Sequence, residues 1–356
     1  MSQEKIAILL FIAAIILILL ELMWLYTVSQ QQEDLLRKNH TRINTAKNII
    51  SAVLSAPSET SQDEEIKRLV DFMNKDKENV LYITSAYLDF NNEKDKLSNE
   101  RKLVLERLYQ KLDPIPALQE LLKHSNNYKC AYIVRCLGLL HAYDAADDIR
   151  EYLDSKNATL VYNAGMALSS LGDEDGVFKY IKLCESNRKY SHRVLLELLD
   201  LYTGDKVSLI KRYIKSKDVD EYVKATVFKS VSDQKFAQLK QEFIDGFYSK
   251  NNQVRIASVK ALSTLGTKDL EQYMITAARD KDWVIRLSSI KGLEQIKTPS
   301  CIDEIKMLTS DEQWWVRQRA AEALVKVDDN LARVESVING YDRYAADAVK
   351  NVLYKQ

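Results

Sequence analysis

The sequence predicts an all-α protein in which a short helical hairpin repeats many times behind one long apolar segment. The chain of 356 residues holds only 9 glycines and 4 prolines, which disfavours folds built from sheets and tight turns. Apolar residues recur at helical spacing twice within each repeating stretch of the chain. An apolar run near the start of the chain has the length of a helix that crosses a bilayer.

The apolar run covers residues 6–28, with Glu21 as its one acidic or basic residue. It is longer than the core of a signal peptide, and no small-x-small cleavage site follows it, so we expect a retained single-pass membrane anchor. Trp24 and Tyr26 suit the interface between lipid and water. Residues 1–28 are therefore expected to form a transmembrane anchor.

Basic residues on either side of the run predict its orientation. Only Lys5 precedes it, whereas four basic residues follow within about 20 positions, the range over which positive charge acts: Arg37, Lys38, Arg42 and Lys47. We therefore expect the N-terminus outside the cell membrane and the repeats in the cytoplasm. The four cysteines show no paired spacing, which fits a reducing compartment. The alternative is a signal-anchor with the body outside, because long domains translocate regardless of charge.

Glu21 is a candidate for contact with a partner. Burying a carboxylate in lipid costs about 2–3 kcal/mol on insertion scales, which favours a partner within the membrane. In the alternative interpretation, Glu21 is protonated or extends toward the interface near Trp24 and Tyr26. The sequence leaves both open.

Residues 29–62 are expected to form a juxtamembrane helix and a linker, and residues 63–98 a helical cap or degenerate repeat, with helices over 63–75 and 78–90. A broken apolar stripe runs along the juxtamembrane helix at Leu35, Leu36, Ile43, Ala46, Ile49, Ile50 and Val53. The helix either continues the anchor and holds the repeats away from the bilayer, or packs its stripe on the cap.

A repeat with a period of about 31 residues occupies most of the remaining chain, within the range typical of solenoid proteins. An apolar or histidine residue followed by a basic one recurs five times at this period, in His192-Arg193, Val223-Lys224, Val254-Arg255, Ile285-Arg286 and Val316-Arg317. Five successive matches at one period are a strong sign of a repeat array. We expect eight units between about residues 99 and 343, so that residues 99–356 form an array with a C-terminal cap.

Each unit has the pattern of two helices. In one unit, the two apolar faces consist of Val254, Ser258, Ala261, Leu262 and Leu265, then Leu270, Met274 and Ala277. Gly172 and Gly266 stand where a helix is expected to end in a turn. Because one hairpin cannot bury both faces, the units are expected to stack into a solenoid with a continuous core.

The repeats resemble short HEAT repeats of about thirty residues, of the type found in phycobilin-lyase-like proteins. The resemblance rests on an Asp followed six residues later by the basic residue of the pair, as in Asp280 and Arg286. Ser249, six residues before Arg255, departs from this pattern. The resemblance implies a right-handed α-solenoid whose second helices line a concave face.

In the family that the repeats resemble, these acidic and basic side chains cross-link neighbouring turns and carry no chemistry. The resemblance assigns this structural role to Asp218, Lys224, Arg255, Asp280, Arg286, Asp311 and Arg317. Trp283 and Trp314 are also one repeat period apart, so we expect them to pack between repeats rather than to stack on nucleic-acid bases.

Lys229, Lys260 and Lys291 recur at the repeat period on the expected second helices, away from the apolar face. A row of lysines in a groove favours an acidic peptide, or an anionic membrane surface if the groove faces one. Exposed lysines also serve solubility alone, and Glu322 ends the row at the next step.

Motifs for catalysis and for cofactors are missing from the sequence. The four histidines stand apart without metal-ligand spacing, and there is no phosphate-binding glycine loop and no Gly-x-Ser-x-Gly motif. Lys plus Arg equals Asp plus Glu at 51 each, so there is no basic excess for nucleic acid. We therefore expect no enzyme, no metal, no cofactor, and neither a nucleic-acid nor a small-molecule partner.

Together these features predict a membrane-anchored cytoplasmic scaffold or adaptor that binds a protein, with an integral membrane protein or enzyme as the expected partner. Its architecture resembles that of accessory subunits of membrane complexes such as polysaccharide-synthesising glycosyltransferases. The alternatives are an enzyme-associated protein of lyase-like or nucleic-acid-binding type, and an extracytoplasmic envelope scaffold.

Overall fold

A computed structural model describes residues 3–186 and 191–354, with side chains from residue 17 onward. These residues form helices joined by turns, with no strand among them, which confirms the all-α prediction. The chain divides into two compact units, the first made of Met1–Ala145 with Lys156–Asn163 and the second of Ala146–Ser155 with Ala164–Gln356.

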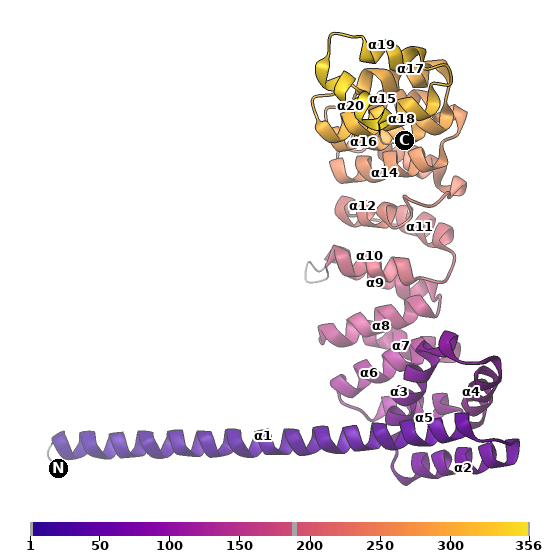
Figure 1. The fold of residues 1–356 in the computed structure, drawn as a ribbon. Helices are drawn as coiled ribbons and strands as arrows, with labels where there is room; N and C mark the ends of the chain where they lie inside the picture. Colours follow the sequence, from indigo (N-terminus) through magenta and orange to yellow (C-terminus); the bar gives the residue numbers. More distant parts are fainter. Residues whose placement is uncertain (1–2, 187–190, 355–356) are drawn as a thin grey trace. The chain divides into compact units, whose positions relative to one another are not determined.

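The first unit begins with α1, a single helix from Gln3 to Ser55 (Figure 1). Its other elements are α2 (Glu59–Lys75), α3 (Asn79–Asn92), η1 (Lys94–Lys96), α4 (Asn99–Leu112), α5 (Pro114–Lys123), α6 (Asn127–Leu139) and η2 (Tyr143–Ala145). Helix α8 (Ala158–Ser170) starts in this unit and continues in the second.

The C-terminal part of α1 supplies the core of the first unit. Ala46, Ile50 and Val53 are fully buried in a cluster with residues of α2, α3 and α4. On the same helix, Arg42 pairs with Asp76 at 2.8 Å. The apolar stripe of the juxtamembrane helix therefore packs on the cap from Ala46 onward.

The N-terminal part of α1 is exposed. Leu35 and Leu36 are open to solvent, as are the apolar residues of the segments 17–20 and 22–26. Among the residues that the structure describes, no helix is both long enough and apolar enough to cross a membrane. Residues 6–16 of the expected anchor lie outside the described side chains.

The second unit is a series of helical hairpins (Figure 1). Its elements are α7 (Ala146–Glu151), η3 (Tyr152–Asp154), the rest of α8, α9 (Glu174–Ser186), α10 (His192–Leu201), α11 (Lys206–Ile214), α12 (Glu221–Lys229), η4 (Ala237–Leu239), α13 (Lys240–Phe247), α14 (Asn252–Leu265), η5 (Lys268–Leu270), α15 (Glu271–Ala278), α16 (Trp283–Ile296), α17 (Pro299–Leu308), α18 (Trp314–Val327), α19 (Ala332–Ile338) and α20 (Arg343–Leu353).

Helices α10, α12, α14, α16, α18 and α20 are called the second helices below, because each closes one hairpin. Each of them packs against the next along the chain, and α13, α15, α17 and α19 pack against them as the first helices. The two apolar faces expected around residues 254–277 are both buried, from Val254 and Leu262 on α14 to Met274 on α15. Stacking of hairpins therefore produces one continuous core.

Two glycines occupy the left-handed turns predicted for them. Gly172 has φ 67° and Gly266 has φ 57°. At Gly266, which ends α14, a Cβ atom would lie 1.9 Å from Oε1 of Gln295. Lys297 ends α16 in the same left-handed conformation, one repeat later and without a glycine. The turn geometry is therefore a property of the repeat, and only some repeats use glycine for it.

The edge-to-face pair Phe228 and Phe243 generates a test of the core, because both rings are fully buried with centroids 5.2 Å apart. Phe228→Ala should lower the free energy of unfolding by about 3–5 kcal/mol, since it removes the ring and leaves a cavity. Urea unfolding followed by circular dichroism measures this.

Tyr222→Ala on the same helix is the matched control, because the Tyr222 side chain is exposed. It should change the free energy of unfolding by no more than about 0.5 kcal/mol. Equal losses in the two variants would contradict the packing described here.

Candidate partner-binding groove

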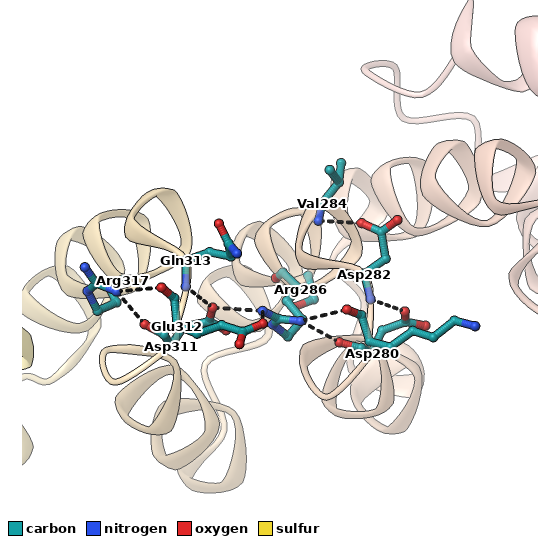
Figure 2. Close-up of polar contacts among 10 residues, drawn as sticks. Asp280, Asp282, Val284, Arg286, Asp311, Glu312, Gln313 and Arg317 are labelled. Atoms are coloured by element: carbon teal, nitrogen blue, oxygen red, sulfur yellow. Dashed lines mark hydrogen bonds and ion pairs between the residues drawn. The ribbon is translucent and has the colours of Figure 1, made fainter.

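Arginine side chains near the start of the second helices connect neighbouring hairpins (Figure 2). The guanidinium of Arg286 on α16 makes two hydrogen bonds to the carboxylate of Asp311, Nε–Oδ2 at 2.7 Å and Nη2–Oδ1 at 2.9 Å. Asp311 belongs to the turn before α18, so the pair joins one hairpin to the next. We call such an arginine–carboxylate pair a rung.

The same guanidinium also closes its own turn. Nη1 of Arg286 donates to the carbonyl oxygens of Asp280 at 2.9 Å and Lys281 at 3.2 Å. The hydrogen bonds from Arg286 to Asp311 hold the pKa of this guanidinium above its usual value. Because the fork of one guanidinium contacts two successive turns, it fixes their spacing.

Neighbouring hairpins repeat parts of this arrangement. Nη2 of Arg255 lies 3.3 Å from both carboxylate oxygens of Asp280, which makes a second rung. Nη1 of Arg317 donates to the carbonyl oxygens of Asp311 at 2.8 Å and Glu312 at 3.0 Å. The arginine that follows each Asp by six residues therefore donates to the backbone carbonyl oxygen of that Asp. The carboxylate of the same Asp instead contacts the arginine of the preceding hairpin.

Asp342 continues the series at the start of α20. It follows Arg317 at the same sequence interval that separates the arginine from the carboxylate in both rungs, and its side chain caps the helix. The amide of Ala345 and the hydroxyl of Ser310 are the main causes that lower the pKa of Asp342, and the charge of Arg317 adds to them.

Asp218 and Lys224 do not form a rung, which corrects the role expected for them. The position at the rung interval after Lys224 is Ser249, whose hydroxyl donates to Glu221 at 2.7 Å. With no carboxylate there, Nζ of Lys224 pairs with Glu221 of its own helix at 3.5 Å. Asp218 lies in a left-handed turn before α12, with φ 55°.

The second helices also form the walls of a groove with a volume of about 420 Å³. Its lining comes mainly from α12, α14 and α16. The second residue of each helix contributes Tyr222, Gln253 and Val284, and the lining also includes Thr226, Ala257 and Ser288. His192 of α10 also lines the groove, with its Nδ1 3.1 Å from the Thr226 hydroxyl. The groove combines apolar surface with hydroxyl groups, as binding sites for peptides and ligands commonly do.

Lys229 and Lys260 line the groove, each as the ninth residue of its helix. Within the described residues the Lys229 ammonium has no hydrogen-bond or ion-pair partner. Lys260 lies 3.7 Å from the exposed carboxylate of Asp233. Lys291, the ninth residue of α16, donates to the Thr264 hydroxyl at 3.0 Å. The three lysines therefore leave positive charge on this face.

Exposed aromatic side chains at the second position of the helices were missed by the sequence analysis. Tyr222 on α12 is 64% exposed, Trp315 on α18 is 62% exposed and Tyr344 on α20 is 73% exposed. Tyr222 lines the groove, and the others occupy the same position on later helices. Tyr222, Gln253, Val284 and Trp315 follow one another at the repeat period, so Tyr222 and Trp315 occupy equivalent positions. Because Gln253 and Val284 are not aromatic, the sequence does not show an aromatic pattern at this position.

Trp283 and Trp314 differ from the expectation that they pack between repeats. Trp314 is 54% exposed, and Trp283 is also exposed. Each is the first residue of its helix, and burial begins two residues later, at Ile285 and Val316. Trp314 instead packs edge-to-face on Trp315, with ring centroids 4.6 Å apart.

Glu21 lies on the exposed part of α1, in the first unit. Its carboxylate has no hydrogen-bond or ion-pair partner among the described residues. No group of three or more His, Cys, Asp or Glu side chains is arranged to hold a metal ion in the part of the chain that the structure describes.

Residues 237–325 and 271–349 match the family model of HEAT repeats. The HEAT-type repeat inferred from the sequence is therefore confirmed over this part of the second unit, while its phycobilin-lyase-type subdivision stays a prediction. No curated protein matches the chain.

Several solved structures resemble the chain. A crystal structure of an engineered protein has 11% identity and a TM-score of 0.37, covering 87% of this chain and 98% of its own. A Kap121p mutant has 16% identity and a TM-score of 0.38, covering 87% of this chain and 37% of its own. Human deoxyhypusine hydroxylase in complex with glycerol has 11% identity and a TM-score of 0.30, covering 81% and 98%.

The rungs generate a test of stability. Arg286→Ala should lower the free energy of unfolding by about 3–5 kcal/mol, because the side chain of Asp311, only 6% exposed, loses the cation that compensates its charge. Urea unfolding measures the loss.

The control is Arg212, an exposed arginine that pairs with Asp175 at 2.7 Å and with Glu174 at 3.2 Å and lies over the Phe178 ring. Arg212→Ala should cost no more than about 1 kcal/mol. Pairing Arg286→Met with Asp311→Asn should recover part of the stability, because no buried charge is then left alone. A loss from Arg286→Ala no larger than that from Arg212→Ala would contradict the role given to the rung.

Proposed function

We propose that the protein is a membrane-anchored scaffold without catalytic activity, whose helical repeats hold a protein partner at the cytoplasmic face of the cell membrane. Residues 6–28 cross the bilayer in this proposal. The second unit supplies the groove that faces the partner, and the protein acts as an accessory subunit of a membrane complex.

Continuity of α1 carries the proposal. The same helix that contains the apolar run supplies Ala46, Ile50 and Val53 to the core of the first unit. A helix that is apolar on all sides requires lipid or protein around it. Apart from Glu21, every residue of the segment 17–26 is apolar or aromatic, and these side chains are exposed in the structure. An anchor built into the folded body would hold that body close to the bilayer.

The basic residues after the apolar run support the orientation. Arg42 and Lys47 pair with Asp76 and Asp89 of the first unit. Arg37 is highly exposed, with a single loose contact to Glu33 at 3.7 Å. Exposed positive charge next to a membrane helix favours the anionic cytoplasmic leaflet.

A polytopic membrane protein is the partner class that Glu21 favours. An ionisable group within a membrane helix is expensive unless it pairs with another protein group. A membrane enzyme, such as a polysaccharide-synthesising glycosyltransferase, is the kind of partner we propose, on likeness of architecture.

Co-purification tests the role of the anchor. The full-length chain, purified in mild detergent from its native membrane, should carry a stoichiometric integral membrane protein. That protein should be lost from a chain lacking residues 1–28 and reduced with Glu21→Leu, because each removes the contact within the lipid. Mass spectrometry of the purified material measures it.

Glu33→Leu is the control for Glu21→Leu, since it removes a carboxylate from the exposed part of α1 beyond the apolar run. Both shortened and substituted chains keep the core residues of α1 and should remain folded. Retention of the membrane protein by the chain that lacks residues 1–28 would contradict an anchor-borne contact.

Thiol labelling tests the orientation. The four native cysteines are buried, and burial raises the pKa of Cys136 and Cys184 to about 12, so they should react little. Tyr341→Cys adds one thiol at a fully exposed position. We expect an impermeant maleimide to label this variant only after the cells are permeabilised.

The unsubstituted chain gives the background of the labelling experiment, because its thiols stay buried. Labelling of Tyr341→Cys in intact cells would place the repeats outside the membrane and favour the extracytoplasmic scaffold.

A further inference from the structure

We propose that the groove of the second unit binds an extended segment of the partner protein, with acidic side chains along one edge and apolar side chains along the other. The inference deepens the proposed scaffold function, since it gives the chemistry of the segment that the scaffold holds. It rests on two rows of side chains that cross the second helices.

The lysine row is the first of these. Lys229, Lys260 and Lys291 are the ninth residues of three successive second helices. Among the described residues Lys229 and Lys291 have no carboxylate partner, and Lys260 has only the exposed Asp233 at 3.7 Å. Some lysines elsewhere in the second unit pair with carboxylates at shorter distances, as in Lys240–Asp269 at 2.8 Å and Lys297–Asp329 at 2.7 Å, whereas others, such as Lys215, have no carboxylate partner among the described residues. Positive charge left over at one repeated position favours an anionic ligand that spans the repeats.

The aromatic row is the second. It consists of the second residues of the helices. Tyr222, the exposed polar Gln253 and the half-buried Val284 line the groove, and the exposed Trp315 and Tyr344 continue the row on α18 and α20, beyond the residues that line it. Exposed aromatic side chains in a groove are typical contacts for apolar side chains of a partner. Arg317 also lies over the Tyr344 ring, 5.6 Å from its centroid, which holds that ring beside α18.

The separation of the rows indicates how a ligand would lie. On each helix the second and ninth residues are two turns apart, about 10 Å at 1.5 Å per residue. A strand that crosses the helices between the rows would direct alternate side chains to opposite sides. One set would reach the lysines and the other would reach Tyr222 and Val284.

The length of the lysine row sets the size of the segment. Packed helices lie about 8–10 Å apart, so three lysines on three helices span about 16–20 Å. An extended chain covers this distance with about five or six residues. A single phosphate or carboxylate ion is too small to contact the whole row, which favours a chain with several acidic residues.

A flat membrane surface fits the groove less well than a peptide. Lys229 and Lys260 line a hollow of about 420 Å³ together with side chains from neighbouring helices. A planar layer of headgroups would contact the edges of such a hollow, whereas a narrow chain can enter it. Nucleic acid is disfavoured because the whole chain has no excess of basic residues.

Selection from a random peptide library tests this inference. The full-length chain in detergent is presented to displayed peptides of about 12 residues, twice the length needed to cross the lysine row. Selected peptides should be enriched in Asp and Glu alternating with aromatic or aliphatic residues. A synthetic copy of one such peptide is then used to measure the dissociation constant by fluorescence anisotropy.

Variants of the groove assign the binding to the two rows. Lys229→Glu combined with Lys260→Glu should weaken binding of the selected peptide about 10- to 100-fold, since attraction becomes repulsion. Lys215→Glu combined with Lys268→Glu makes the same change of charge at two exposed lysines outside the groove and should leave binding almost unchanged. Tyr222→Ala should weaken binding by reducing contact with the apolar edge. Unchanged helical content and thermal unfolding show that each variant is folded.

The outcomes are distinct from those of the proposed function. Absence of any selected peptide, selection without acidic enrichment, or equal binding by the groove variant would overturn the inference. Binding to vesicles with about 30% phosphatidylserine that the groove variant loses, with no acidic peptide selected, would overturn it in favour of a membrane surface. In each of these cases, co-purification of a membrane protein through α1 would still support the proposed function.

Discussion

The need of each hairpin to bury two apolar faces determines the rest of the second unit. A second helix such as α14 packs on α12 at one side and on α16 at the other, and the helices α13 and α15 cover it further. Val254, Ala261 and Leu262 are completely buried as a result, while Gln253 and Lys260 stay exposed. Packing thus leaves one strip of each second helix free, and the groove consists of these strips placed side by side.

Polar contacts fix the position of each hairpin relative to the next, whereas apolar packing holds the stack together. The apolar faces alone would allow neighbouring hairpins to slide, because apolar attraction is not directional. Arg286 contacts its own turn through carbonyl oxygens and the next turn through Asp311. Such a fork tolerates little displacement, so it adds a directional constraint to a non-directional one. Lys224, which has no carboxylate at the rung interval, marks a junction without this constraint.

Much of the fold follows from local patterns, and those parts could be predicted from the sequence. The helices, the two faces of residues 254–277 and the turn at Gly266 all depend on residues close together in the chain. The partners of Arg286 could not be read in the same way, because the spacing to Asp280 is visible while the approach of Asp311 depends on tertiary packing. Trp314 was expected to pack between repeats because it lies one repeat period after Trp283, but its exposure depends on where the helix starts.

Only part of the groove could be predicted from the sequence, because only part of it follows a visible sequence pattern. The lysine row is visible because three identical residues recur at one period. The aromatic row is not, since Tyr222, Gln253, Val284 and Trp315 share a position but little chemistry, and Tyr344 follows Trp315 at an interval shorter than the repeat period. Residues that serve one surface can differ in type, and only the structure shows that they face the same way.

The ninth position of the second helices has a consequence for how such a protein can change over evolutionary time. Packing and rungs use other positions, so a substitution there alters the surface without reaching the core. Lysine at three helices and Glu322 at the corresponding position of α18 show that opposite charges are tolerated within one array. Ligand preference and stability are therefore separable traits in this fold, and each repeat contributes one independent site at which preference can be altered.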